Sequence, residues 1–475
     1  MAVTSASRSA AIRARLEHPV IDVDGHTVEF EPGFLDVLQQ VGGSGVVARY
    51  LAQRDRLAGA RWYRLSLAER LAQRATRPPW WFLPTKNTLD RATATLPRLL
   101  HERLPETGID FTILYPTEGL AFPHLSDEEL RRACCRALNV FHAEIFRPYA
   151  DRMTPAAVIP LHTPQEGIAE LDYAVQQLGL KAILIPSYVR RQLPNGQRWL
   201  DVLALDSAYD YDPFWARCVE LGVVPACHSS GMGWGSRTAV TNYMYNHIGH
   251  FAAAAEALCK ALFFGGVTRR FPTLKVAFLE CGVAWACSLY ADLVGHWEKR
   301  NRQRLENYNP ANLDRQQYFA LLERYGGSLV ADKLEALRQA PPRLGEQQEP
   351  ELLDEWAACQ ITRAEEIRDL FVPHFYFGCE ADDPLNAWAF NTRVNPFGAR
   401  LRAMLSSDIG HWDVPDMTSV TEEAYELVEK GLISAEDFRD FAFTHPATLY
   451  AGTNPDFFRG TAVEQAVRTL LAASS

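Results

Sequence analysis

Short apolar runs alternate along this chain with longer stretches in which apolar residues recur every three to four positions. The runs have the length of buried strands, and the longer stretches have the period of helices that cover a sheet. Repeated alternation of this kind predicts parallel βαβ units. Predicted strands span 109–116, 153–161, 181–185 and 275–279, and predicted helices span 127–146, 164–178, 213–221 and 251–264.

The repetition of these units favours an α/β fold of the closed (β/α)₈ TIM barrel type over an open doubly wound sheet. No glycine-rich phosphate loop follows the first predicted strand, 20–26, as it would in a dinucleotide-binding fold. In such a barrel the carboxyl ends of the strands form one face, where catalytic residues collect. We therefore expect a single barrel domain over residues 1–475 with its site at that face.

Two stretches are too long for ordinary strand–helix loops and predict insertions into the barrel. The first, near 50–105, is rich in Arg, Leu and Trp. It fits a lid over the site, and it fits equally well a dimer contact or a packed loop. The second, near 298–370, is charged and irregular, with helical patterns over 316–324 and 331–339.

Composition narrows the range of partners and compartments. A chain of 475 residues with 47% apolar content can bury a large core, and its net charge of −10 argues against nucleic acid as a partner. Nothing in the sequence resembles a signal peptide and no apolar run reaches about 18 residues, so we expect neither a signal peptide nor a membrane partner. Its nine cysteines form no disulfide framework, which indicates a reducing cytoplasm.

Candidate metal-ligating groups stand at three predicted strand ends. Asp24 and His26 are two residues apart, so on a strand they point to the same side. His228 ends the run 223–228, and Asp408 follows the run 401–407. Two carboxylates and two imidazoles suit Zn²⁺ or another divalent metal. Each piece also has a structural explanation, since Asp-Gly-His is a common turn and a histidine after a strand is often a hydrogen-bonded core residue.

The order of several motifs makes the chain resemble the amidohydrolase superfamily, amidohydrolase family 2. The resemblance is to the branch of aminocarboxymuconate-semialdehyde decarboxylase and the resorcylate and vanillate-type decarboxylases, and it runs from about residue 20 to 455. It rests on the Asp24-Gly25-His26 pair and on four further motifs: His228-Ser229-Ser230-Gly231, Phe264-Gly265-Gly266-Val267 with 271–276, Glu280-Cys281-Gly282-Val283-Ala284-Trp285, and Ser407-Asp408-Ile409-Gly410-His411.

The resemblance implies a mononuclear metal site with Asp24, His26, His228 and Asp408 as ligands. Zn²⁺ is the expected ion, with Mn²⁺ or Fe²⁺ as alternatives. A divalent ion lowers the pKa of bound water and polarises a substrate oxygen. In the hydrolases of the family the carboxylate at the Asp408 position takes a proton from that water, and in some decarboxylases it passes a proton to the substrate.

One position departs from many family members. They carry a histidine after the strand that matches 275–279, whereas this chain has Glu280, as other members do. We therefore expect a metal-dependent hydrolase acting on a small organic acid or aromatic molecule. A non-oxidative decarboxylase of an aromatic or enoic acid is the alternative, and an inactive barrel that serves as a binding module is a second alternative. Glu280 would orient a ligand or the substrate, or donate a proton.

Other side chains are candidates for supporting roles. His250 and His411 compete with Glu280 for the acid role. Trp234 and Arg237 are candidates for substrate binding, because the loop after His228 offers a stacking surface and a cation for a carboxylate. His162, at the end of the predicted strand 153–161, is a further candidate for substrate binding. We expect a small-molecule substrate and, as in many members of the branch, a homodimer or a larger homo-oligomer.

Overall fold

The computed structural model describes residues 7–57, 59–79, 84–228, 234–341 and 353–474. Within these ranges eight strands form one sheet in the order β1-β2-β3-β4-β7-β8-β9-β10, and all hydrogen-bonded neighbours are parallel. The strands are β1 (Ile21–Thr27), β2 (Phe111–Pro116), β3 (Met153–Val158), β4 (Ala182–Ile185), β7 (Pro225–Cys227), β8 (Val276–Phe278), β9 (Phe375–Cys379) and β10 (Arg402–Leu405).

Backbone hydrogen bonds bring the end of the last strand back to the first. The Asp408 N–H donates to the Asp24 carbonyl at 2.9 Å, and the His26 N–H donates to the Ile409 carbonyl at 2.8 Å. Both bonds lie just beyond β10, so the sheet closes at the carboxyl ends of its strands. The predicted (β/α)₈ TIM barrel is confirmed.

Alternate residues of the strands face two different apolar clusters. Leu114, Ile183 and Phe278 belong to one cluster, whereas their chain neighbours Ile113, Leu184 and Ala277 belong to the other. Successive side chains of a strand point to opposite faces, so the strands are packed on both sides. This is why the strands read in the sequence as continuous apolar runs.

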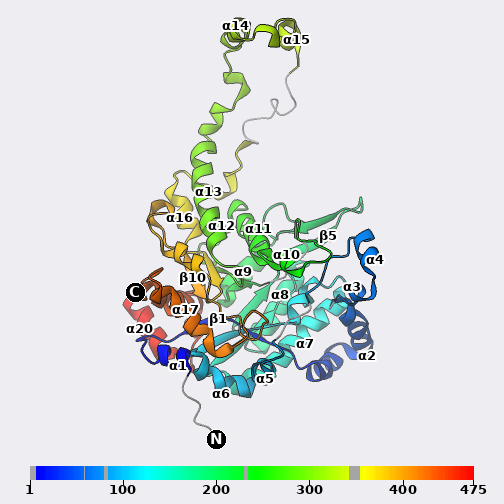
Figure 1. Ribbon diagram of the computed structural model, residues 1–475, viewed down its shortest axis with the longest axis vertical. Coiled ribbons are helices and arrows are strands. Elements are labelled where there is room, and N and C mark those ends of the chain that lie inside the picture. The colour runs from blue at the N-terminus through cyan, green and yellow to red at the C-terminus, as the bar shows by residue number, and fades with distance from the viewer. Residues whose placement is uncertain (1–6, 58, 80–83, 229–233, 342–352, 475) are drawn as a thin grey trace.

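Helices surround the barrel (Figure 1) and begin at the residues that cap them. Asp127 accepts a hydrogen bond from the Leu130 N–H at 3.0 Å, and Thr163 accepts one from the Glu166 N–H at 3.1 Å. The helices that follow or flank the strands are α7 (Glu128–Phe146), α8 (Pro164–Asp172), α9 (Asp212–Leu221), α11 (His250–Phe264), α13 (Ala284–Arg300), α16 (Glu365–Phe371), α17 (Val420–Glu429) and α19 (His445–Tyr450). None of the helices in the described ranges is long and apolar enough to cross a membrane.

Most of the described residues near 50–105 are helical, and the expected start of this stretch falls inside a long helix. That helix, α2 (Glu31–Leu57), is interrupted at Gly43, whose φ of 75° lies in the left-handed region that suits glycine. Four further helices follow, and Trp80, Trp81 and Phe82 lie outside the described residues. The four are α3 (Ala60–Arg64), α4 (Leu67–Ala72), α5 (Thr88–Thr95) and α6 (Pro97–Thr107).

The second insertion forms an arm that leads away from the barrel beyond α13 (Figure 1). Its tip carries α14 (Arg315–Tyr325) and α15 (Leu334–Gln339), and no residue of either helix is buried. The expected homo-oligomer stays a prediction. A short antiparallel hairpin after β4, formed by β5 (Val189–Gln192) and β6 (Arg198–Asp201), was not predicted.

Candidate metal centre

Three side chains meet at the carboxyl ends of β1 and β7. His26 Nε2 lies 3.0 Å from His228 Nε2 and 3.5 Å from Asp24 Oδ1. His228 Nε2 lies 3.2 Å from Asp24 Oδ1. All three side chains are fully buried. Asp24 and His26 share one side of β1 because they are two residues apart on the strand. The three predicted ligands therefore converge on one point.

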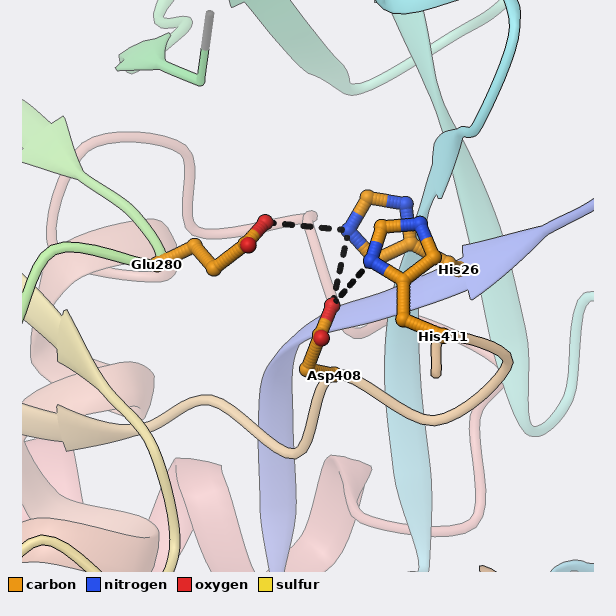
Figure 2. A group of neighbouring side chains, drawn as sticks. All are labelled: His26, Glu280, Asp408 and His411. Carbon is orange, nitrogen blue, oxygen red and sulfur yellow. Dashed lines mark ion pairs between the residues drawn. The ribbon is translucent and has the colours of Figure 1, made fainter. Parts of the chain in front are cut away.

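Two carboxylates from later strand ends complete the cluster. Asp408 Oδ1 lies 3.2 Å from His26 Nε2. Glu280 Oε2 lies 3.4 Å from His228 Nε2 and 3.8 Å from His26 Nε2. Figure 2 shows Glu280 and Asp408 pointing at His26 from different loops. Glu280 thus stands among the candidate ligands, closer to the centre than a purely supporting position would require.

The unpaired atoms of the cluster fit a bound cation. Asp24 Oδ1 and Glu280 Oε2 are buried and have no hydrogen-bond partner among the described residues, and the buried Asp408 Oδ1 lies in ion-pair contact with the imidazoles of His26 and His411. A buried carboxylate oxygen without a partner is costly, and a divalent ion at this point would satisfy several at once. Imidazole nitrogens with carboxylate oxygens are the donor set of Zn²⁺, Mn²⁺ and Fe²⁺ sites.

Neighbouring polar groups hold the ligands in place. Asp24 uses its other oxygen, Oδ2, to accept a hydrogen bond from Ser406 Oγ at 2.8 Å, which turns Oδ1 toward the imidazoles. Asp22 lies deeper on β1 and accepts hydrogen bonds from Thr112 Oγ1 at 2.7 Å and from Ser407 Oγ at 2.8 Å. These contacts tie β1 to β2 and to the segment that carries Asp408.

Both outer carboxylates are carried by unusual backbone. Glu280 has a φ of 52° and Asp408 a φ of 51°, in the left-handed region that residues other than glycine rarely adopt. Such backbone costs free energy and persists where the surrounding structure enforces it, commonly at functional sites. The two residues therefore leave their strands with a sharp turn that directs each carboxylate to the centre.

Burial sets the protonation of the cluster when no cation is present. It raises the pKa of Glu280 well above its ordinary value, with further contributions from the charges of Asp24 and Asp413. Burial and the charge of Glu280 raise the pKa of Asp408 in the same way. Burial also lowers the pKa of His26, followed by the charges of His411 and His228. The His26 imidazole is thus held in the neutral form that binds metals.

His411 lies directly against the predicted ligands. Its Nδ1 is 2.7 Å from Asp408 Oδ1, and its ring stacks on the His26 ring at a centroid distance of 3.7 Å (Figure 2). On the far side, His411 Nε2 lies 3.2 Å from Thr117 Oγ1. Burial lowers the pKa of His411 to about 4. The ring therefore links Asp408 to a hydroxyl on the edge of the site.

The remaining candidates lie farther out. His250 is buried, its Nδ1 bonds to the His247 carbonyl, and its ring packs on Phe251 at 4.1 Å rather than on a ligand. Trp234 packs on Tyr188 at 5.2 Å, and Arg237 donates to the Ile248 carbonyl at 3.3 Å. His162 follows β3, and no described contact joins its ring to the ligands. Residues 229–233, in the loop that carries Trp234 and Arg237, lie outside the described residues.

Several neighbours of the site escaped the sequence analysis. Asp22 carried a readable signal, because it alternates with Asp24 on the same strand. Ser406 carried no such signal, because its hydrogen bond to Asp24 depends on the closure of the barrel. The aromatic and imidazole side chains of Tyr243, His247 and Trp412 form a connected group whose charged neighbours include Glu280, Asp408 and Asp413.

Comparisons with known proteins agree with this architecture. Residues 102–326 match the amidohydrolase family. The decarboxylase OrsB of Emericella nidulans is 29% identical over 157 residues, which cover 30% of this chain and 42% of that protein. The aligned part is thus less than half of that relative's length.

Two solved structures share the fold over nearly the whole chain. An amidohydrolase from Mycobacterium avium subsp. paratuberculosis K-10 superposes with a TM-score of 0.52 at 17% identity, covering 92% of this chain and 98% of that one. The 5-carboxyvanillate decarboxylase LigW of Sphingomonas paucimobilis superposes with a TM-score of 0.50 at 13% identity, covering 91% and 98%. At these identities the likeness concerns the fold.

Proposed function

Because this chain belongs to the amidohydrolase family, we propose that it is a metal-dependent decarboxylase of a small aromatic or enoic acid. The observation that carries the proposal is two groups of possible metal ligands that share the buried His26: Asp24, His26 and His228 in one, and His26, Glu280, Asp408 and His411 in the other. The reaction type is drawn from the named relatives that are decarboxylases. This order of preference reverses our expectation from the sequence, in which hydrolysis stood first.

Asp24, His26, His228 and Asp408 would hold the ion, with Glu280 beside them. Zn²⁺ is the ion we propose, and Mn²⁺ and Fe²⁺ suit the same donors. When bound, the ion supplies positive charge that holds and polarises an oxygen of the substrate. The protein supplies the side chains that surround that oxygen and keep water away from it, and it supplies the proton.

Decarboxylation of this kind needs a proton donor at the carbon that loses the carboxylate. That carbon accepts a proton, the bond to the carboxylate carbon breaks, and its electron pair returns to the ring or double bond as CO₂ leaves. We assign the proton to Asp408, whose Oδ1 lies 2.7 Å from His411 Nδ1. His411 is placed to restore the proton to Asp408 after each turnover.

Glu280 is the second carboxyl group that can carry a proton in the site. Its raised pKa favours the protonated form before a cation binds. With Oε2 facing both imidazoles, Glu280 either joins the ligands or donates to the substrate. Arg237 and Trp234, in the loop after His228, are the side chains we propose for the carboxylate and the ring of the incoming acid.

Hydrolysis is the second candidate, and Glu280 is the observation that favours it. Many decarboxylases of the family carry a histidine at this position. The route by which the proton reaches the substrate in those enzymes therefore cannot be applied unchanged to this chain. In a hydrolase, Asp408 would accept a proton from water instead of giving one to carbon.

Product analysis separates the two reactions. The purified protein, with its metal content measured, is incubated with a panel of aromatic and enoic acids, and with their amides and esters, in ¹⁸O-labelled water. Release of CO₂ without ¹⁸O in the organic product supports decarboxylation, and ¹⁸O in a new carboxylate supports hydrolysis. A protein that neither contains nor takes up a divalent ion would contradict both and favour a binding module.

A further inference from the structure

The arm beyond α13, residues 301–341, exposes many large apolar side chains. It leads away from the barrel (Figure 1), and no residue of its helices α14 and α15 is buried. Single exposed apolar side chains are common on protein surfaces, whereas a dense group of them marks contact with another protein. Seven such side chains of the arm are 41% to 77% exposed: Tyr308, Leu313, Tyr318, Leu321, Tyr325, Leu329 and Leu337.

The two helices of the arm lack the packing that normally stabilises a helix. Helix α14 has 11 residues and α15 has 6. Isolated helices shorter than about 12–15 residues are marginal in water, and most helices in proteins depend on packing of an apolar face. An ion pair between Arg338 and Glu323 joins the two helices, but an exposed pair contributes little. We therefore expect another molecule to cover the arm.

A second apolar surface lies at the root of the arm. After β9 the chain forms two short 3₁₀ helices, η10 (Pro384–Phe390) and η11 (Pro396–Gly398). Tyr290 Oη on α13 donates to the Pro396 carbonyl at 3.1 Å, which fixes this 384–398 segment to the helix that leads into the arm. Four large apolar side chains of the segment are 39% to 67% exposed: Leu385, Trp388, Val394 and Phe397.

The two surfaces carry complementary charge. The arm has six basic and five acidic residues, although the whole chain has a net charge of −10. The ion pairs described within the arm use Lys333 and Arg338 as their cations. The exposed Asp382 and the half-buried Asp383 stand at the start of the 384–398 segment. Opposite charges at two surfaces favour their association. Four arginines of the arm form no ion pair with a described residue: Arg302, Arg304, Arg315 and Arg324.

We propose that the arm docks on the 384–398 segment of a second copy of this chain, whose own arm docks on the first copy in return. One chain carries both surfaces, as a two-fold dimer requires, because each copy then contributes the same pair of patches. At roughly 200 Å² for a fully exposed large side chain, the eleven side chains expose about 1,000 Å² per copy. A stable interface needs roughly 800 Å² per partner. The proposal does not depend on the proposed function.

The test measures the mass of the full-length protein in solution by sedimentation between about 1 and 100 µM. The wild type should have the mass of two chains in the upper part of this range. The arm variant, Tyr325→Glu with Leu329→Glu, and the segment variant, Trp388→Glu with Val394→Glu, should each raise the dissociation constant about 100-fold or more, as when two central contacts are lost. Circular dichroism checks that both variants are folded.

The matched control is Leu432→Glu, which places the same charge on another apolar side chain that is 45% exposed. It should keep the wild-type dissociation constant. A mixture of the arm variant with the segment variant should form a dimer again, because one intact arm then faces one intact segment. The proposal is overturned if the wild type has the mass of one chain throughout, or if either variant stays a dimer. A dimeric segment variant would mean that the arm binds elsewhere.

Hydrogen exchange of the wild type gives a measurement that does not depend on any variant. Amide groups of α14 and of the 384–398 segment should exchange more slowly at about 100 µM than at about 1 µM, since docking of the arm covers both. Exchange in the short exposed helix α4 (Leu67–Ala72) should not change with concentration. Slower exchange in the arm alone, or in neither surface, contradicts the proposal.

Discussion

His26 Nε2 and His228 Nε2 lie 3.0 Å apart although their strands, β1 and β7, stand on opposite sides of the barrel. Three strands separate β1 from β7 in either direction around the sheet. Two imidazole nitrogens at this distance, with Asp24 Oδ1 within 3.5 Å of both, share one position for a cation. The relationship makes the centre a product of barrel closure.

The double substitution His26→Ala with His228→Ala should remove the ion. Both nitrogens that face the shared position are lost, and the remaining carboxylates repel one another. Metal content per chain is measured after purification with added Zn²⁺ and after dialysis. His296→Ala, at an exposed histidine whose Nδ1 bonds to the Asp292 carbonyl, is the control and should keep the ion. Stoichiometric metal in the double variant would disprove the site.

Asp408→Asn should abolish turnover while sparing the fold. Asparagine keeps the shape and one oxygen ligand but cannot carry the proton, so the rate should fall by about 10²–10⁴-fold, as when other acid–base groups are lost. Rate, metal content and circular dichroism are measured on the same sample, because part of the loss can come from the ion. Turnover close to that of the wild type would show that Asp408 does not handle the proton.

Metal affinity should rise with pH. Without a cation, the pKa values of Asp408 and Glu280 are raised, so both carboxyl groups hold protons that must leave when the ion binds. His26 does not compete for protons, since its pKa is lowered. Zn²⁺ affinity measured between about pH 5 and pH 8 should therefore increase, with protons released on binding. Asp408→Asn should flatten the slope, and an unchanged slope would contradict the assignment.

His142→Leu should make the metal-free protein more resistant to acid. Burial lowers the pKa of His142 to about 3, so below its ordinary value of 6.5 the unfolded chain takes up a proton that the folded chain does not. The stability contribution is present above pH 6.5 and is lost at about 1.4 kcal/mol per pH unit as the pH falls. Urea unfolding across this range should show a shallower loss in the variant. His296→Leu, at the exposed histidine, should leave the slope unchanged.

The sequence alone determined the barrel and half of the centre. Strands packed on both faces must be apolar throughout, so their runs are visible in the sequence, and the helices between them carry their own period and caps. Asp24 and His26 could be paired for the same local reason, since residues two apart on a strand share a side. Histidine and aspartate at the other strand ends were visible as candidates.

Tertiary structure decided what long-range closure brings together. Glu280 reaches both imidazoles because its backbone takes a left-handed turn after β8. A glutamate followed by a cysteine does not predict that turn from the sequence. Ser406 meets Asp24 only because the end of β10 returns to β1. Tyr243 and Trp412 are 169 positions apart in the chain and become neighbours through the loops that the barrel presents on one face. Contacts of this kind depend on the summed geometry of many strands, which local periodicity does not encode.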